Sequence, residues 1–171
     1  KEAGLPDDIF NIVQGDKVVV DAILEHPEIS AISFVGSTQI GEYVYQKGTS
    51  NNKRVAAFTG GKNHMVVMPD ADLEAAANAF VSAGFGSASQ RCMAVSLLLP
   101  VGVETAEKLR ELIITKTIAL KMGAYNDESA DFGAVISSQS KQSVLKAIDQ
   151  CIEDGAELLL DGRSYQHPEY K

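Results

Sequence analysis

Cys92 is the residue in this sequence best suited to covalent chemistry. It lies in segment 87–94, Ser-Ala-Ser-Gln-Arg-Cys-Met-Ala, between a predicted helix and a predicted strand. Arg91 precedes it directly. A nearby cation favours the nucleophilic thiolate, and small neighbouring side chains leave a thiol within reach of a substrate. The alternative is a buried, inert cysteine that behaves as a small hydrophobic residue, which is the commoner fate of a free thiol. The segment by itself leaves both interpretations open.

A second candidate segment covers residues 36–41, Gly-Ser-Thr-Gln-Ile-Gly, between a predicted strand and a predicted helix. A glycine lets the backbone approach a ligand closely, and the free N–H groups at the start of a helix favour an anion. The segment is not the GxGxxG dinucleotide-binding pattern, and a serine before a helix is often no more than an N-cap. Anion binding by Gly36 and Ser37 is therefore one of two open interpretations.

The other metal-ligating and nucleophilic residue types predict no further site. His26, His64 and His167 have no partners at the spacing of a metal site or a serine-type triad. The two cysteines form no CxxC pair, which argues against a zinc site and a disulfide scaffold and favours a reducing compartment. Cys151 has the pattern of a core residue on a predicted helix, so we expect it to be structural.

The composition limits the class of protein. The chain has 171 residues, of which 45% are hydrophobic and 22% charged, values that suit a packed globular fold and argue against disorder or a coiled coil. The net charge of −8 offers no basic face for a phosphate backbone, so we expect no nucleic-acid partner. No apolar run approaches the ~18 residues of a membrane span, so we expect no membrane partner. The chain begins without a methionine or a signal region and ends without a capping element, which favours an internal piece of a longer protein.

Short β-branched runs alternate with amphipathic stretches along the chain, a pattern typical of an α/β fold with parallel strands. Asp16 is placed to cap the first helix, and Ser37 or Thr38 the second. The adjacent glycines Gly60 and Gly61 interrupt this alternation of predicted strands and helices, and we place a domain boundary there. The predicted strands cover residues 10–13, 31–35, 53–58, 64–68, 97–101 and 158–160, and the predicted helices cover residues 16–26, 38–48, 72–85, 104–120 and 139–153.

The sequence resembles the aldehyde dehydrogenase superfamily over essentially its whole length. Four segments match in the order that the family shows: residues 4–15, residues 33–41 of the cofactor-binding strand and helix, Gly-Gly-Lys at 60–62, and Gln-Arg-Cys at 90–92. Residues 61–64, 67–71, 90–94 and 158–163 are most similar to the CoA-acylating branch, which acts on malonate and methylmalonate semialdehyde. The resemblance raises Cys92 from one of two interpretations to the expected nucleophile.

The resemblance also implies a fold and an assembly. Residues 1–60 would be the later part of a doubly wound NAD-binding domain, and residues 61–171 the first part of an α/β catalytic domain that carries the thiol. The parent would be a homo-oligomer, such as a homotetramer, in the cytoplasm or the mitochondrial matrix. Family members are several times longer than this chain, so we expect this piece alone to bind cofactor poorly and to catalyse little.

The chemistry that the resemblance implies for the parent centres on Cys92. Its thiolate would attack an aldehyde, its backbone N–H would help to hold the oxyanion, NAD would accept the hydride, and the resulting thioester would pass its acyl group to CoA with loss of CO₂. For cofactor binding we expect Ser37 to hold the pyrophosphate, Ile40 to flank the adenine and Thr59 to offer backbone to the nicotinamide side. The complete set of expected cofactor-binding residues is Gly36, Ser37, Ile40, Thr59 and Gly60.

Two further residues bear on specificity. Hydrolytic members of the superfamily carry a glutamate four residues before the lysine of Gly-Gly-Lys, and that position is Phe58 here, which cannot act as a base for water. Arg91 could bind the carboxylate of a semialdehyde substrate, although a structural salt bridge is an equal alternative. Two other functions stay open: a hydrolytic NAD(P)-dependent aldehyde dehydrogenase, and a non-catalytic interaction module.

Overall fold

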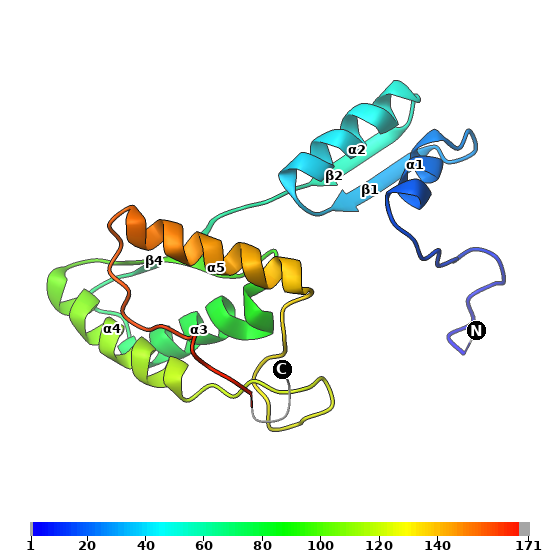
Figure 1. The fold of residues 1–171 in the computed structure, drawn as a ribbon. Coiled ribbons are helices and arrows are strands. Elements are labelled where there is room, and N and C mark those ends of the chain that lie inside the picture. The colour runs from blue at the N-terminus through cyan, green and yellow to red at the C-terminus, as the bar shows by residue number, and fades with distance from the viewer. Residues whose placement is uncertain (1, 168–171) are drawn as a thin grey trace. The chain divides into compact units, whose positions relative to one another are not determined.

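The structure is a computed structural model that describes residues 2–167. The chain divides into two compact units, Lys1–Gly61 and Lys62–Lys171. Both units contain parallel strands with intervening helices, as Figure 1 shows, and this confirms the predicted α/β class.

The first unit consists of α1 (Lys17–Glu25), β1 (Ala31–Val35), α2 (Thr38–Ser50) and β2 (Arg54–Phe58). β1 and β2 pair in parallel over their full length, from Ala31 opposite Arg54 to Val35 opposite Phe58. The Asp16 side chain accepts a hydrogen bond from the Val18 N–H at 3.0 Å, so it caps α1 as the sequence predicts. The predicted bounds of these four elements agree with the structure to within two residues.

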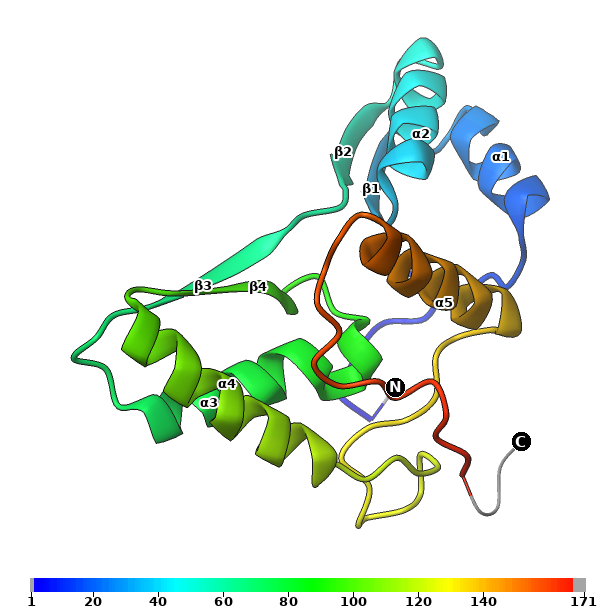
Figure 2. The same cartoon turned by 60° about the vertical axis from the view of Figure 1, so that its left-hand side comes forward.

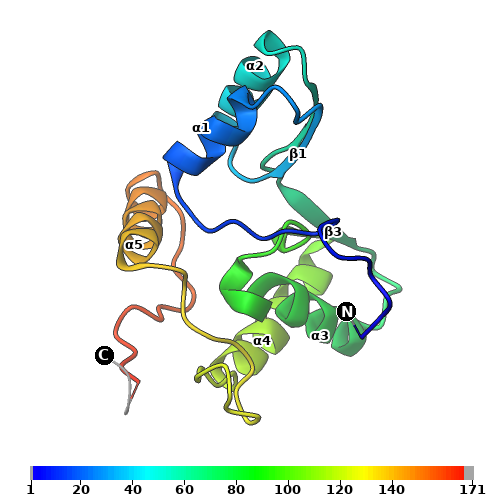
Figure 3. The same cartoon turned by 90° about the vertical axis from the view of Figure 1, so that its right-hand side faces the viewer.

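One face of the first sheet is covered and the other is open. Side chains alternate between half-buried and exposed along both strands, and Figure 3 shows α1 and α2 on the same side of β1. Gly48 lets α2 approach the sheet, because a Cβ atom there would lie 2.6 Å from a methyl group of Val55. Leu24 of α1 and Val44 of α2 are buried, which makes them the centre of this small core.

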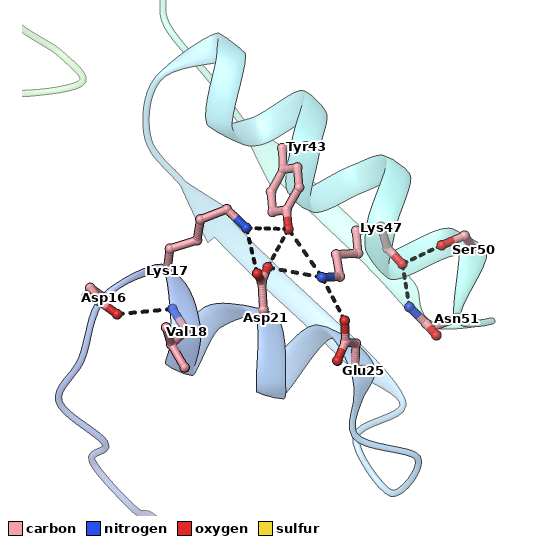
Figure 4. Close-up of polar contacts among 9 residues, drawn as sticks. All are labelled: Asp16, Lys17, Val18, Asp21, Glu25, Tyr43, Lys47, Ser50 and Asn51. Carbon is pink, nitrogen blue, oxygen red and sulfur yellow. Dashed lines mark hydrogen bonds and ion pairs between the residues drawn. The ribbon is translucent and has the colours of Figure 1, made fainter.

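A polar cluster joins α1 to α2 on their outer surface (Figure 4). Asp21 accepts hydrogen bonds from Lys17 and Tyr43, and Lys47 lies 3.2 Å from the same carboxylate and 2.7 Å from that of Glu25. The hydrogen bonds from Lys17 and then Tyr43 hold the pKa of Asp21 well below its ordinary value of 3.8. The cluster therefore favours the contact of the two helices while Asp21 stays ionised.

The second unit contains β3 (Asn63–Val67), α3 (Leu73–Phe85), the short 3₁₀ helix η1 (Gly86–Ser89), β4 (Val95–Pro100), α4 (Val103–Ile118) and α5 (Ser138–Glu153). β3 and β4 pair in parallel, and α3 and α4 lie together along them, as Figure 2 shows. The core forms around Val67 of β3, Ala77 of α3 and Leu109 of α4, all of which are buried. Asp72 caps α3 by accepting a hydrogen bond from the Ala75 N–H at 3.1 Å.

Two predicted strands are wrong. Residues 10–13 form an irregular segment in which Phe10 is 70% and Ile12 is 72% exposed, and residues 158–160 are also irregular. A run of apolar residues becomes a strand only where a neighbouring strand takes up its backbone hydrogen bonds. No strand lies beside either run in the part of the chain that the structure describes.

Candidate functional site

A first candidate site lies at the carboxyl ends of β1 and β2, within the first unit. Gly36 continues the pairing beyond β1, since its N–H donates to the Phe58 carbonyl at 3.1 Å. Ser37 occupies the N-cap position of α2, but its hydroxyl makes no capping hydrogen bond. The hydroxyl and the first N–H groups of a 13-residue helix are thus both available to a ligand. In α/β proteins this edge of a parallel sheet is where nucleotides bind.

Glycines bring the residues after β2 against the start of α2. A Cβ atom on Gly41 would lie 2.3 Å from the Thr59 methyl group, and one on Gly60 would lie 3.4 Å from the Thr38 hydroxyl. A side chain at Gly41 would therefore force Thr59 away from the helix.

The structure thus gathers all the predicted cofactor-binding residues at one edge of the first unit. They are exposed, with Ile40 at 48%. Their role in binding NAD stays a prediction. The residues concerned are Gly36, Ser37, Ile40, Thr59 and Gly60.

A second candidate site, within the second unit, is the turn that carries Cys92. The cysteine is exposed and lies three residues after the end of η1, in a turn closed by the Ala94 N–H donating to the Arg91 carbonyl at 3.1 Å. Its exposure does not agree with the alternative of a buried, inert thiol. Within residues 2–167 the Cys92 N–H donates to no acceptor. That amide is free to donate to a negative charge that develops on a bound substrate.

The Asn63 side chain holds the other side of this turn. Its Nδ2 donates to the Cys92 carbonyl and to the Ala94 carbonyl, each at 2.9 Å. Sequence reasoning missed this residue. Asn63 follows Gly-Gly-Lys in the sequence, and only the pairing of β3 with β4 brings it to a turn 29 residues further along the chain.

The backbone that leads to Cys92 is left-handed at three successive residues. Ser87, Ala88 and Ser89 have φ values of 55°, 50° and 62°, a region that costs an L-residue ~1–2 kcal/mol. The Ser89 hydroxyl donates to the Gly84 carbonyl, and the Gln90 N–H donates to the Ser87 carbonyl at 3.0 Å. These bonds help to hold a conformation that these residue types do not favour by themselves.

Arg91 turns back toward the end of α3. A Cβ atom on Gly86 would lie 2.8 Å from an Arg91 guanidinium nitrogen, so only a glycine leaves room for this conformation. The guanidinium lines a cavity of about 220 Å³, together with Asp131 and Phe132 among others. Arg91 forms no ion pair with any residue between 2 and 167, so the alternative of a structural salt bridge has no partner in that range.

The expectation that Cys151 is a core residue is wrong. Cys151 is exposed on α5, a helix that buries no residue. The amphipathic pattern of α5 marks an apolar face, but its members Val144 and Ile152 are still 49% and 39% exposed. A pattern identifies a face that can be buried, whereas burial also needs a partner surface.

No group of three or more His, Cys, Asp or Glu side chains gathers in residues 2–167 as a metal ion would require. Over the same residues, every helix is too short or too polar to cross a membrane.

Comparison with known proteins gives the chain a family. The sequence profile of the aldehyde dehydrogenase family matches residues 1–171. The chain belongs to the aldehyde dehydrogenase family. It is 47% identical over 165 residues to a malonate-semialdehyde dehydrogenase of Pseudomonas aeruginosa, covering 96% of this chain and 33% of that protein. It is 43% identical to a bovine mitochondrial enzyme named methylmalonate-semialdehyde/malonate-semialdehyde dehydrogenase [acylating], covering 100% of this chain and 32% of that one.

Solved aldehyde dehydrogenases show the same fold. A Sinorhizobium meliloti chain crystallised with NAD, and assigned as a methylmalonate-semialdehyde dehydrogenase, matches with a TM-score of 0.94 and 51% identity. The match covers 99% of this chain and 34% of that one. A Staphylococcus aureus betaine aldehyde dehydrogenase in complex with NAD⁺ matches with a TM-score of 0.84 and 27% identity over 93% of this chain and 32% of that one. The predicted aldehyde dehydrogenase-like fold is confirmed, and the chain spans about a third of the length of the relatives that it matches.

Proposed function

We propose that the full-length protein oxidises malonate or methylmalonate semialdehyde with NAD through a thioester on Cys92 and transfers the acyl group to CoA. The observation that carries the proposal is that Cys92 is exposed on a turn and that its backbone N–H is unpaired within residues 2–167. Membership of the aldehyde dehydrogenase family and the names of the relatives support the choice of substrate.

The Cys92 thiolate adds to the aldehyde carbon and forms a C–S bond, while the carbonyl oxygen takes up the negative charge. The Cys92 N–H is a fixed donor for that oxygen, and loss of one such donor typically costs ~10²–10³ in rate. When bound, NAD supplies the acceptor for the hydride that leaves this carbon, and the bond to sulfur becomes a thioester.

The first unit offers the groups that would hold NAD. The pyrophosphate is an anion that suits the start of α2, where the Ser37 hydroxyl and the free N–H groups lie. Ile40 presents an exposed apolar side chain for the adenine. Thr59 and Gly60 follow β2 at the same edge of the sheet, where their backbone can approach the nicotinamide side.

The acyl group leaves Cys92 by transfer to CoA. A malonyl-type thioester first loses its carboxylate as CO₂, and the α-carbon of the enolate that remains takes up a proton. The CoA thiolate then attacks the carbonyl while the Cys92 thiolate departs. Phe58 stands where hydrolytic relatives place their base, and its side chain is 63% exposed and cannot accept a proton. Without a positioned base, attack by water loses a factor of ~10²–10⁴, whereas a thiolate needs less help.

Arg91 is the residue that we propose to select a carboxylated substrate. It precedes the thiol directly, and within residues 2–167 its guanidinium is not engaged by an acidic side chain. An arginine can bind a carboxylate with two parallel hydrogen bonds. Arg91→Ala should then reduce kcat/KM far more for a semialdehyde acid than for propanal, and equal losses would contradict this role.

The deciding experiment is product analysis with the full-length protein, malonate semialdehyde and NAD, with and without CoA. We expect sustained NADH formation and acetyl-CoA only when CoA is present. Equal free-acid formation with and without CoA would instead indicate a hydrolytic aldehyde dehydrogenase. No NADH at all would favour a non-catalytic module.

A further inference from the structure

We propose that Asn63 is a positioning residue for the nucleophile: its carboxamide fixes the turn that aims the thiol and the backbone N–H of Cys92. The inference rests on the proposed role of Cys92 and assigns a function to a residue outside the cysteine segment. Asn63 reaches the turn from β3, the strand that neighbours β4.

The carboxamide of Asn63 is fully used as a donor. Nδ2 carries two hydrogens, and its two acceptors are the carbonyls of Cys92 and Ala94, at 2.9 Å each. Few side chains can bridge two carbonyls from one nitrogen at this length. The two bonds hold the residues before and after Met93, which is itself 80% exposed and can fix nothing by packing.

Together with the turn bond, Asn63 secures both peptide groups that flank Cys92. The group before Cys92 is held through the Arg91 carbonyl, which accepts from the Ala94 N–H at 3.1 Å. The group after it is held through the Cys92 carbonyl, which accepts from Asn63. A peptide group is planar, so fixing the two groups sets φ and ψ of Cys92. The direction of the unpaired N–H and of the Cα–Cβ bond follows from these angles.

Asn63 lies where the pairing of β3 with β4 is irregular. Asn63 pairs with Val95, but the next pair is His64 with Leu97, so Ser96 is an extra residue in β4. Such a bulge turns the strand locally and often lies beside a functional site. Here it directly follows the Cys92 turn, and Asn63 spans both features.

The chemistry of the contact requires an amide. Asn63→Asp keeps the shape but replaces the donor by an anion that faces two carbonyl oxygens. Asn63→Ser keeps one possible donor on a shorter side chain. The predicted order of activity is therefore asparagine, then serine, then aspartate. A residue that only filled space would tolerate aspartate best.

The test compares Asn63→Asp with Asn51→Asp in the full-length protein. Asn51 is a matched control, because its Nδ2 also donates to a backbone carbonyl, that of Lys47 at 2.9 Å, at the far end of α2 from Ser37. Stopped-flow measurement of the first NADH turnover should show a 10- to 100-fold slower step for Asn63→Asp, about the penalty for a misplaced reacting group. Asn51→Asp should be unchanged, and the NAD Kd should stay the same in both variants.

A second readout does not depend on the proposed reaction. Hydrogen exchange in the peptide that covers residues 91–95 should become faster in Asn63→Asp and stay unchanged in Asn51→Asp. If the wild-type protein shows no NADH burst but the two variants show this exchange pattern, the proposed function is refuted, whereas the role of Asn63 in fixing the Cys92 turn is retained. If Asn63→Asp loses NAD binding and so has not folded, Asn63→Ser serves in its place. Equal rates and equal exchange for Asn63 and Asn51 variants would overturn the inference.

Discussion

Ala88→Gly should stabilise the left-handed turn before Cys92, which is an uncommon effect for a substitution by glycine. Ala88 has φ 50° and ψ 40°, which costs an L-residue ~1–2 kcal/mol that a glycine avoids. Against this gain stand ~0.4 kcal/mol for the loss of a half-buried methyl group and ~0.4–1 kcal/mol for the greater freedom of the unfolded chain. The net expectation is a local stabilisation of about 0.5 kcal/mol.

Ala79→Gly is the matched control, because Ala79 is exposed in the middle of α3. The same change should there destabilise the helix by about 1 kcal/mol. Native-state hydrogen exchange on the full-length protein measures both locally. We expect the amide of Gln90 to exchange about twofold more slowly in Ala88→Gly and the amides around residue 79 about fivefold faster in Ala79→Gly. Faster exchange of Gln90 in Ala88→Gly would refute the strained geometry.

Three other variants test separate parts of the structure. Gly41→Ala should weaken NAD binding about tenfold, because its Cβ would meet the Thr59 methyl at 2.3 Å; Gly48→Ala, with a similar clash at the other end of α2, should leave the NAD Kd unchanged in equilibrium titration. Asp21→Asn should lower the urea midpoint of the full-length protein at neutral pH. The pKa of Asp21 lies below 3.8 in the folded chain, so the difference from wild type should be constant above about pH 5 and shrink as the pH falls through 3.8 and below. Phe58→Glu should raise free-acid formation without CoA about 100-fold in a product assay, and an unchanged rate would show that residue 58 does not decide the acyl acceptor.

Local patterns predicted the regular elements well. Asp16 caps the helix that its position indicates, and the alternation of strands and helices agrees with the parallel pairs. The errors arise where tertiary partners decide. Within residues 2–167, residues 10–13 have the composition of a strand but no neighbouring strand to pair with, and Cys151 lies on an apolar helix face that no other element covers.

The candidate site was predictable only in part. The segments around Ser37 and Cys92 could be identified from their glycine, serine and cysteine residues. The structure places the first after the end of a strand and the second in a turn. The role of Asn63 depends on strand pairing. Residues 87–89 have a left-handed backbone but contain no glycine, the residue type from which such a backbone could have been predicted. Such features arise from the surrounding fold and leave no local signal.

In the proposed reaction, Cys92 carries an acyl group that CoA removes. The most direct measurement is a rapid-quench reaction of the full-length Cys151→Ser protein with malonate semialdehyde and NAD but without CoA, followed by mass analysis of the peptide that contains residue 92. We expect about one NADH per site, a stall, and an acyl adduct on Cys92 that disappears when CoA is added. Continuous turnover without CoA, or a stalled enzyme whose Cys92 is unmodified, would contradict the claim.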